Sequence, residues 1–179
     1  IDENGIDFDL LVDVKEKRRA RLTEYAAEKP TATYHEGSVW SYAGNYDIAL
    51  PCATQNEING EAAKRLVAQG VICVSEGANM PSDLDAIAVY KENGIFYGPA
   101  KAANAGGVAV SALEMSQNSL RLSWTREEVD GRLKDIMTNI FNTAKTTAET
   151  YGLGKDYLAG ANIAAFENVA NAMIAQGIV

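Results

Sequence analysis

The sequence of 179 residues contains few of the side chains from which metal and nucleophile sites are built. It holds a single histidine, His35, and two cysteines, Cys52 and Cys73, which stand 21 residues apart. A structural zinc site needs about four ligands at close spacing, so we expect no metal site. A lone histidine in an irregular segment is also a poor basis for a Ser–His–Asp triad. Two unpaired thiols are typical of a reducing compartment, and we expect a cytoplasmic protein.

Basic residues are also in the minority. The chain has 16 lysines and arginines against 24 aspartates and glutamates, a formal charge of −8, which repels phosphate backbones. We therefore expect no nucleic-acid partner. The basic run at 15–21 lies in a helical pattern with glutamate interspersed, and we interpret it as a solvated helix face, with an anion site as the alternative. No apolar run reaches the roughly 18 residues that span a bilayer, so we expect no transmembrane helix and no membrane partner.

Two nucleotide-binding motifs are missing as well. The sequence contains no G-x-G-x-x-G turn, which normally opens a dinucleotide-binding domain, and no G-x-x-x-x-G-K-[ST] loop. Hydrophobic residues nevertheless make up 47% and charged residues 22% of the chain, as in ordinary globular proteins. The composition therefore predicts a folded domain without the usual phosphate-binding signals.

The sequence does contain a regular alternation of patterns. Short apolar runs begin at residues 47, 71 and 95, each 24 residues after the one before. Helical patterns at 61–69 and 82–92 separate them, and Ser82 is the expected N-cap of the second. Strands that alternate with single helices predict βαβ units and a parallel sheet.

The segments on either side of this alternation are mostly helical in pattern. Thr125 and Glu128 form a capping-box signature at the start of one of them. In the same helix we expect Met137 and Phe141 to belong to the core. The flanking predictions are helices at 8–29, 108–122, 125–151 and 160–176, and a short strand at 32–34.

Three segments rich in polar and small residues follow the predicted strands, at 53–56, 76–79 and 104–107. Because the carboxyl ends of parallel strands meet at one edge of a sheet, we expect these segments to lie where such folds bind ligands. Asn and Gln amides both donate and accept hydrogen bonds, as a carboxamide or a ribose requires, and two glycines at a helix start favour an anion. The alternative interpretation is that they are ordinary polar loops.

These segments resemble a known family. The stretches DIALPCATQNE (47–57), EGANMP (76–81) and KAANAGGV (101–108) are similar to signatures of the hexameric glutamate dehydrogenases. GANIA (160–164) and AMIAQG (172–177) match as well, so the resemblance covers nearly the whole chain in order. It implies an α/β fold: a partial Rossmann-like sheet, doubly wound and mainly parallel, followed by C-terminal helices.

The resemblance also implies a reaction and a site. The family reductively aminates 2-oxoglutarate with ammonium and NADPH to L-glutamate, and runs the reverse reaction; an iminium takes the hydride. It implies NADP rather than NAD and a homo-hexamer of the full-length protein. The family's catalytic lysine and aspartate would lie in an N-terminal part, so we assign no catalytic residue here. By resemblance, the cofactor-binding residues are Ala53, Thr54, Gln55, Gly77, Asn79 and Asn104, with Asn104 at the nicotinamide carboxamide, and the substrate-binding residues are Val108 and Ser111.

The same resemblance divides the chain. Residues 1–107 would be a partial dinucleotide-binding Rossmann-like domain that lacks its first βαβ unit. Residues 108–179 would be a helical segment packed on it and facing an absent substrate domain. The chain would then be a C-terminal fragment, inactive by itself. Two alternatives stay open from the residues: a complete, non-catalytic α/β module that binds a nucleotide or a protein, and an assembly module based on the long terminal helices.

Overall fold

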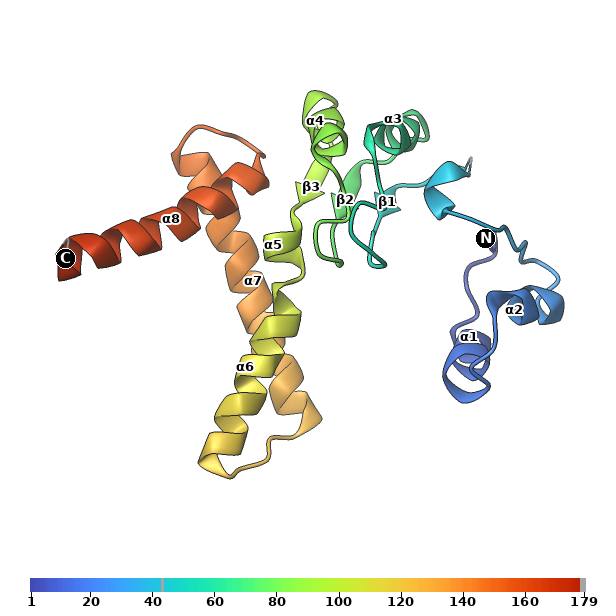
Figure 1. The fold of residues 1–179 in the computed structure, drawn as a ribbon, viewed down its shortest axis with the longest axis horizontal. Coiled ribbons are helices and arrows are strands. Elements are labelled where there is room, and N and C mark those ends of the chain that lie inside the picture. Colours follow the sequence, from blue (N-terminus) through green and yellow to red (C-terminus); the bar gives the residue numbers. More distant parts are fainter. Residues whose placement is uncertain (43, 178–179) are drawn as a thin grey trace. The chain divides into compact units, whose positions relative to one another are not determined.

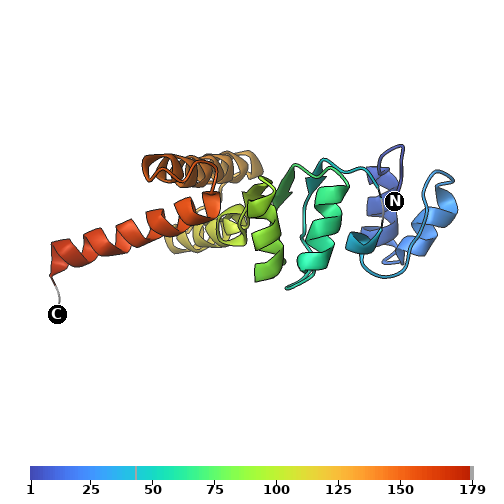
Figure 2. The same ribbon diagram turned by 90° about the horizontal axis from the view of Figure 1, so that it is seen from above.

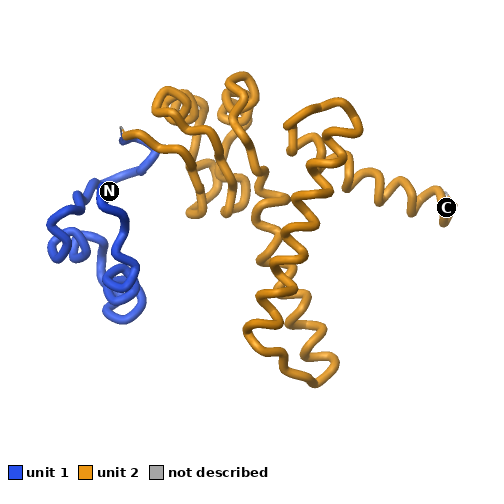
Figure 3. Tube along the Cα trace, turned by 180° about the vertical axis from the view of Figure 1, so that it is seen from behind, with its two compact units in different colours: residues 1–42 blue, residues 43–179 orange. Residues whose placement is uncertain are grey.

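The computed structural model describes residues 1–42 and 44–177. The chain divides into two compact units, residues 1–42 and residues 43–179 (Figure 3). The boundary that we expect at residue 107, between a nucleotide-binding part and a helical part, falls inside a helix of the second unit and stays a prediction.

The first unit contains short helical segments where the sequence pattern predicts one helix over 8–29. α1 (Phe8–Val12) runs into a π-helical segment, η1 (Asp13–Lys17), and α2 (Leu22–Glu28) begins only after a break. Arg19 lies in that break with a left-handed backbone, φ 53°. The prediction of a single helix is therefore wrong, because the break lets α2 pack against η1. A 3-10 turn, η2 (Val39–Ser41), follows later in the unit.

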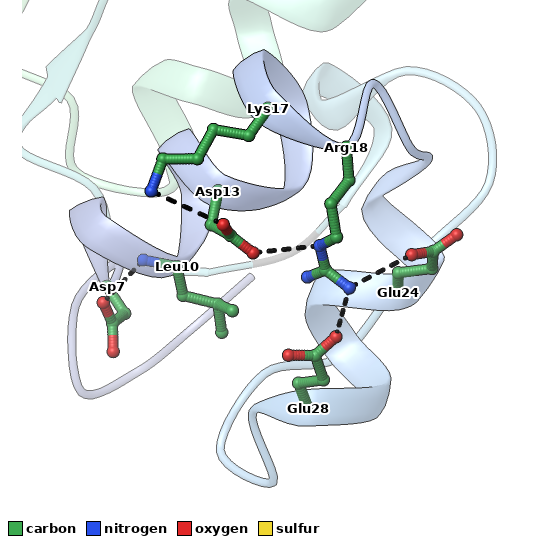
Figure 4. A network of polar contacts seen from close by, with 7 residues as sticks. All are labelled: Asp7, Leu10, Asp13, Lys17, Arg18, Glu24 and Glu28. Atoms are coloured by element: carbon green, nitrogen blue, oxygen red, sulfur yellow. Dashed lines mark hydrogen bonds and ion pairs between the residues drawn. The ribbon is translucent and has the colours of Figure 1, made fainter.

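Arg18 is the centre of an ion-pair network in this unit (Figure 4). Its Nη1 lies 2.7 Å from Glu28 Oε1 and 3.3 Å from Glu24 Oε2, and its Nε lies 3.0 Å from Asp13 Oδ2. The hydrogen bond to Glu28 raises the pKa of Arg18 above its ordinary value. Lys17 Nζ also pairs with Asp13, at 3.6 Å. These contacts favour the interpretation of the basic run as a helix face, because two of its cations, Lys17 and Arg18, form ion pairs with carboxylates of the same unit.

The strand predicted at 32–34 does not form. Ala32 makes one isolated antiparallel bridge with Asp2. The Thr33 N–H donates to the Ile1 carbonyl at 2.8 Å, and the Ile1 amino group donates to the Thr33 carbonyl at 3.0 Å. These few bonds hold the first residues to the unit without extending into a ladder.

The second unit is built on a parallel sheet (Figure 1). Its described strands are β1 (Ile48–Ala49), β2 (Cys73–Ser75) and β3 (Phe96–Gly98), in the spatial order β1-β2-β3. Each pairs in parallel with the next, and α3 (Gly60–Ala68) and α4 (Leu84–Glu92) connect them. The predicted βαβ alternation and the partial Rossmann-like α/β class are confirmed.

One face of the sheet is covered by helices. Ala49, Val74 and Tyr97 form a row across the three strands, and all three are buried. α3 and α4 lie side by side on this face (Figures 1 and 2). The ring of Tyr97 packs on Tyr90 of α4, with 5.4 Å between the ring centroids. The buried face of the sheet and the two helices on it form the core that supports the loops at the strand ends.

The opposite face is less covered. The row on that side is Ile48, Cys73 and Phe96, in register across the strands. Ile48 is 59% exposed and Phe96 38% exposed. Parallel sheets normally carry helices on both faces, so this row is the incomplete side of the layer.

In the described part of this unit four helices follow β3. They are α5 (Ala100–Ala103), α6 (Ala105–Leu120), α7 (Arg126–Thr150) and α8 (Tyr157–Gln176). The capping box predicted at the start of α7 is confirmed, because Thr125 and Glu128 each accept a backbone N–H of the other. The cap predicted for α4 is wrong: Asp83, and not Ser82, accepts the Ala86 N–H, at 2.8 Å. None of the described helices combines the length and the apolar character that crossing a membrane requires.

α7 and α8 cross at small residues. Gly160 of α8 lies against Ala144 and Ala148 of α7, and all three are buried. The start of α8 is also tied to α4, because Lys91 Nζ lies 2.9 Å from Asp156 Oδ2 while Asp156 caps α8. The terminal helices are therefore fixed both to each other and to the sheet layer.

Candidate functional site

The loops that follow β1 and β2 are joined through their backbones. The Asn56 N–H donates to the Met80 carbonyl at 3.0 Å, and the Ile58 N–H donates to the Pro81 carbonyl at 2.9 Å. The Gly77 N–H donates to the Pro51 carbonyl at 3.0 Å. These bonds bring the first two polar segments together at the carboxyl edge of the sheet, as the strand pattern predicts.

Gly77, in the loop after β2, lies close to the loop after β1. A Cβ at this position would lie 2.5 Å from Cys52 Sγ, closer than real Cβ contacts allow. A side chain here would force the exposed Cys52 Sγ to rotate away, while Cys52 Cβ and Cα, at 3.4 and 3.8 Å, would be at ordinary contact distance. Gly77, predicted as a cofactor-site residue, thus lies directly against the loop after β1.

Glu57 orders the loop that carries Ala53, Thr54 and Gln55. Its Oε1 accepts the Ala53 N–H at 2.9 Å and the Thr54 N–H at 3.1 Å. All three predicted residues are exposed. Because Glu57 already accepts two of the backbone N–H groups, a ligand here would meet mainly side chains and carbonyls.

A buried carboxylate, Glu76, lies behind the loop edge and is 2% exposed. Its Oε1 accepts the Ser82 N–H at 3.2 Å. Its Oε2 accepts the Tyr97 hydroxyl and the Ala100 N–H, both at 2.8 Å. Glu76 therefore connects the loop after β2 with β3 and with the first residue of α5.

Asn104 makes the second connection between these elements. It is the residue between α5 and α6, and its Nδ2 donates to the Ala78 carbonyl at 3.1 Å and to Asn79 Oδ1 at 2.9 Å. The structure thus brings together two of the predicted cofactor residues, Asn79 and Asn104. Asn79 is exposed and Asn104 is half-buried, so the pair faces solvent at the sheet edge.

The predicted substrate residues continue from Asn104 along α6. Val108 is 72% exposed, and Ser111 is exposed with its hydroxyl donating to the Gly107 carbonyl at 3.3 Å. The spacing 104, 108, 111 places all three on one helix face. Gly107 is one of the two glycines expected to favour an anion, but its N–H donates to the Asn104 carbonyl at 3.2 Å.

Tyr90 lies behind this edge, fully buried, with its hydroxyl 3.2 Å from the Ser82 hydroxyl. Burial raises the pKa of Tyr90 to about 12, while an unfolded tyrosine titrates near 10. Between pH 10 and 12 the unfolded chain loses this proton and the folded chain keeps it. The free energy of unfolding should therefore fall with rising pH across this window, by about 2 kcal/mol.

The Tyr90→Phe variant tests this pH dependence. At pH 7 it should be less stable than the wild type by about 1 kcal/mol, since it loses the bond to Ser82. Urea unfolding from pH 9 to pH 12 should show the two free energies of unfolding converging and then crossing at about pH 11, because the wild type loses about 2 kcal/mol. Parallel curves over that range would contradict the assignment.

A cavity of about 480 Å³ lies on the other side of β2 and β3, against α5, α7 and α8. Its walls are largely apolar, and Cys73 and Phe96 of the less covered sheet face contribute to them. Phe141, predicted to be core, lines this cavity and is 53% exposed, so that prediction is wrong. Its ring packs edge-on against Tyr157 of α8 instead. None of the predicted cofactor or substrate residues lines the cavity.

Across residues 1–42 and 44–177, no three His, Cys, Asp or Glu side chains gather as metal ligands would. The profile of the Glutamate/Leucine/Phenylalanine/Valine dehydrogenase family matches residues 1–177.

The chain belongs to this family.

Individual members of the dehydrogenase family are similar over the whole chain. An NADP-specific glutamate dehydrogenase of Giardia intestinalis is 50% identical over 100% of the chain and 41% of its own length. A glutamate dehydrogenase of Bacteroides thetaiotaomicron is 52% identical over 99% of the chain and 40% of its own length. The crystal structure of a Plasmodium falciparum glutamate dehydrogenase, 46% identical, superposes with a TM-score of 0.90 over 99% of this chain and 39% of that one. The chain thus spans about 40% of the length of these dehydrogenases.

Glu76 is the residue of this loop edge whose buried position the sequence does not predict. It opens the EGANMP stretch, but its acidic side chain predicts an exposed loop residue. Its position directly after the apolar run of β2 was the one indication of burial. A charged side chain that points into the core at such a position needs hydrogen-bond partners.

Proposed function

We propose that this chain supplies the cofactor-binding edge of an NADP-dependent glutamate dehydrogenase. The enzyme would convert 2-oxoglutarate, ammonium and NADPH to L-glutamate and carry out the reverse reaction. The observation that carries the proposal is the Asn79–Asn104 pair at the carboxyl edge of a parallel sheet, in a chain of this family. The name of the Giardia relative, an NADP-specific enzyme, supports NADP over NAD.

The donor set at this edge fits a dinucleotide. Both of these bonds of Asn104 use its Nδ2, so its Oδ1 would accept an N–H of a nicotinamide carboxamide. Gly77 and Asn79 would lie near a ribose, and Ala53, Thr54 and Gln55 would line the same site. When bound, NADPH supplies the hydride of the reaction. The chain's own residues bind and orient it.

Val108 and Ser111 would line the substrate pocket, on the face of α6 that begins at Asn104. The Ser111 hydroxyl can give up its bond to the Gly107 carbonyl and donate to the distal carboxylate of 2-oxoglutarate or glutamate. The exposed side chain of Val108 would pack against the carbon chain of the substrate.

We also propose that the whole protein is a homo-hexamer in the cytoplasm. Membership of the family supports the assembly. Cys52 and Cys73 are free thiols, as is usual in a reducing compartment, and this supports the location.

The test of the function is turnover by the intact protein that carries this sequence. We expect oxidation of NADPH, followed by its absorbance, that depends on both 2-oxoglutarate and ammonium. An intact protein that binds another nucleotide tightly and turns over neither substrate would instead favour a non-catalytic nucleotide-binding module.

The 179 residues produced by themselves should be inactive in the same assay. The catalytic lysine and aspartate that the family resemblance implies would lie outside these residues. The intact protein, assayed at the same molar concentration, is the positive control. Measurable ammonium-dependent turnover by the 179-residue chain would show that this chain holds its own catalytic groups.

A further inference from the structure

Two contacts fix the loop after β2 to α5, one at each end of that short helix. At the start of α5, the Ala100 N–H donates to Glu76 Oε2. At its end, Asn104 Nδ2 donates to the Ala78 carbonyl and to Asn79 Oδ1. Glu76 and Asn79 are three residues apart in the same loop. Glu76 and the Asn79–Asn104 pair therefore join the same two elements.

Glu76 is held by donors alone. Its partners are two backbone amides and the Tyr97 phenol, none of them a cation. A buried carboxylate is tolerated when hydrogen bonds replace its hydration, and three donors do so here. At 2% exposure the carboxylate cannot itself touch a ligand at the loop surface.

We propose that Glu76 is a positioning residue for cofactor binding. By gathering the Ser82, Tyr97 and Ala100 donors, it sets the geometry of the Asn79–Asn104 pair that receives the nicotinamide end of the dinucleotide. This inference rests on the proposed function. It assigns Glu76 an effect on cofactor affinity, beyond the contribution to stability that any buried hydrogen bond makes.

The carboxylate is specifically required, because an amide of the same size cannot accept three hydrogen bonds from these directions. In Glu76→Gln the carbonyl oxygen can keep Tyr97 and Ala100, but the new NH₂ then faces the Ser82 N–H, donor against donor. In the opposite orientation the NH₂ faces the Tyr97 hydroxyl and the Ala100 N–H, which are donors as well, so both of those bonds are lost. Either way the loop that carries Asn79 must shift.

The experiment measures steady-state kinetics of Glu76→Gln in the intact protein. We expect the KM for NADPH to rise on the order of tenfold, while kcat and the KM for 2-oxoglutarate stay within about twofold of the wild type. A purely structural role would lower the amount of folded protein and leave the KM for NADPH unchanged. An unchanged KM for NADPH in a folded, active variant overturns the inference.

A matched pair of variants decides the question even if Glu76→Gln does not fold. Tyr97→Phe removes one hydroxyl bond that reaches Glu76, and Ser82→Ala removes one hydroxyl bond that reaches only Tyr90. Both should lower the melting temperature, but only Tyr97→Phe should raise the KM for NADPH, by roughly threefold. Equal KM values in the two variants overturn the inference while the activity stands. An inactive wild type overturns the proposed function, and the inference with it.

Discussion

Replacing Gly160 by alanine should destabilise the second unit by about 3 kcal/mol. The added Cβ would lie 2.1 Å from the Ala144 carbonyl oxygen and 3.0 Å from both the Ala144 carbonyl carbon and Ala148 Cβ. Two of these atoms are backbone of α7, so no side chain can rotate away to make room. α7 and α8 would have to separate along the crossing that buries Ala144 and Ala148.

Urea unfolding followed by circular dichroism measures this loss, because α7 and α8 contain 25 and 20 helical residues. The unfolding midpoint of Gly160→Ala should fall well below that of the wild type. Its melting temperature should fall with it.

Gly131→Ala is the matched control for this substitution. Gly131 is an exposed residue of α7, and a Cβ there would meet nothing within 4 Å. Because alanine is the better helix former, this variant should gain about 0.5 to 1 kcal/mol. If Gly160→Ala were as stable as Gly131→Ala, the helices would not cross as closely as the structure describes.

Replacing Asn104 by aspartate should lower the affinity for NADPH on the order of 100-fold. A carboxylate has no N–H, so both bonds to the Ala78 carbonyl and to Asn79 Oδ1 are lost. The new charge also stands beside two oxygens and repels a dinucleotide that carries phosphates. Each lost bond is worth about 1 kcal/mol, and the repulsion adds to this loss.

Fluorescence titration of the intact protein with NADPH measures the affinity directly. Asn118→Asp is the charge-matched control, because Asn118 is exposed on α6, well along the helix from the Asn79–Asn104 pair. It should bind NADPH as the wild type does. Similar weakening in both variants would show that only the net charge matters, and unchanged binding in Asn104→Asp would remove Asn104 from the cofactor site.

The sequence predicts the sheet well because its signals are local. Each strand lies in or directly after a short apolar run, the pattern typical of parallel sheets. The loop motifs follow these runs directly, so placing the strands also places Asn79 and Asn104 at one edge. That they are bonded to each other is a property of the fold, because 25 residues separate them.

Local signals fail where a distant partner decides the outcome. Ser82 is a good N-cap by type, but its hydroxyl is taken by Tyr90 and its N–H by Glu76, and Asp83 caps α4 instead. Phe141 has the spacing of a core residue, yet the cavity beside it leaves the side chain 53% exposed. The break near Arg19 is a third case, because no proline or glycine stands within residues 8–29 to predict it.

The order of the strands has a consequence for synthesis of the chain. Among the described strands, spatial order equals sequence order, so no later strand must insert between two earlier ones. Each pairing joins segments about 25 residues apart, which keeps the entropy of loop closure low and favours fast folding. As the chain leaves the ribosome, β2 can pair with β1, and β3 can then pair with β2, before α7 and α8 have been translated. The sheet edge that carries Asn79 can therefore take shape during translation, and the Asn104 contact closes onto it when α5 emerges.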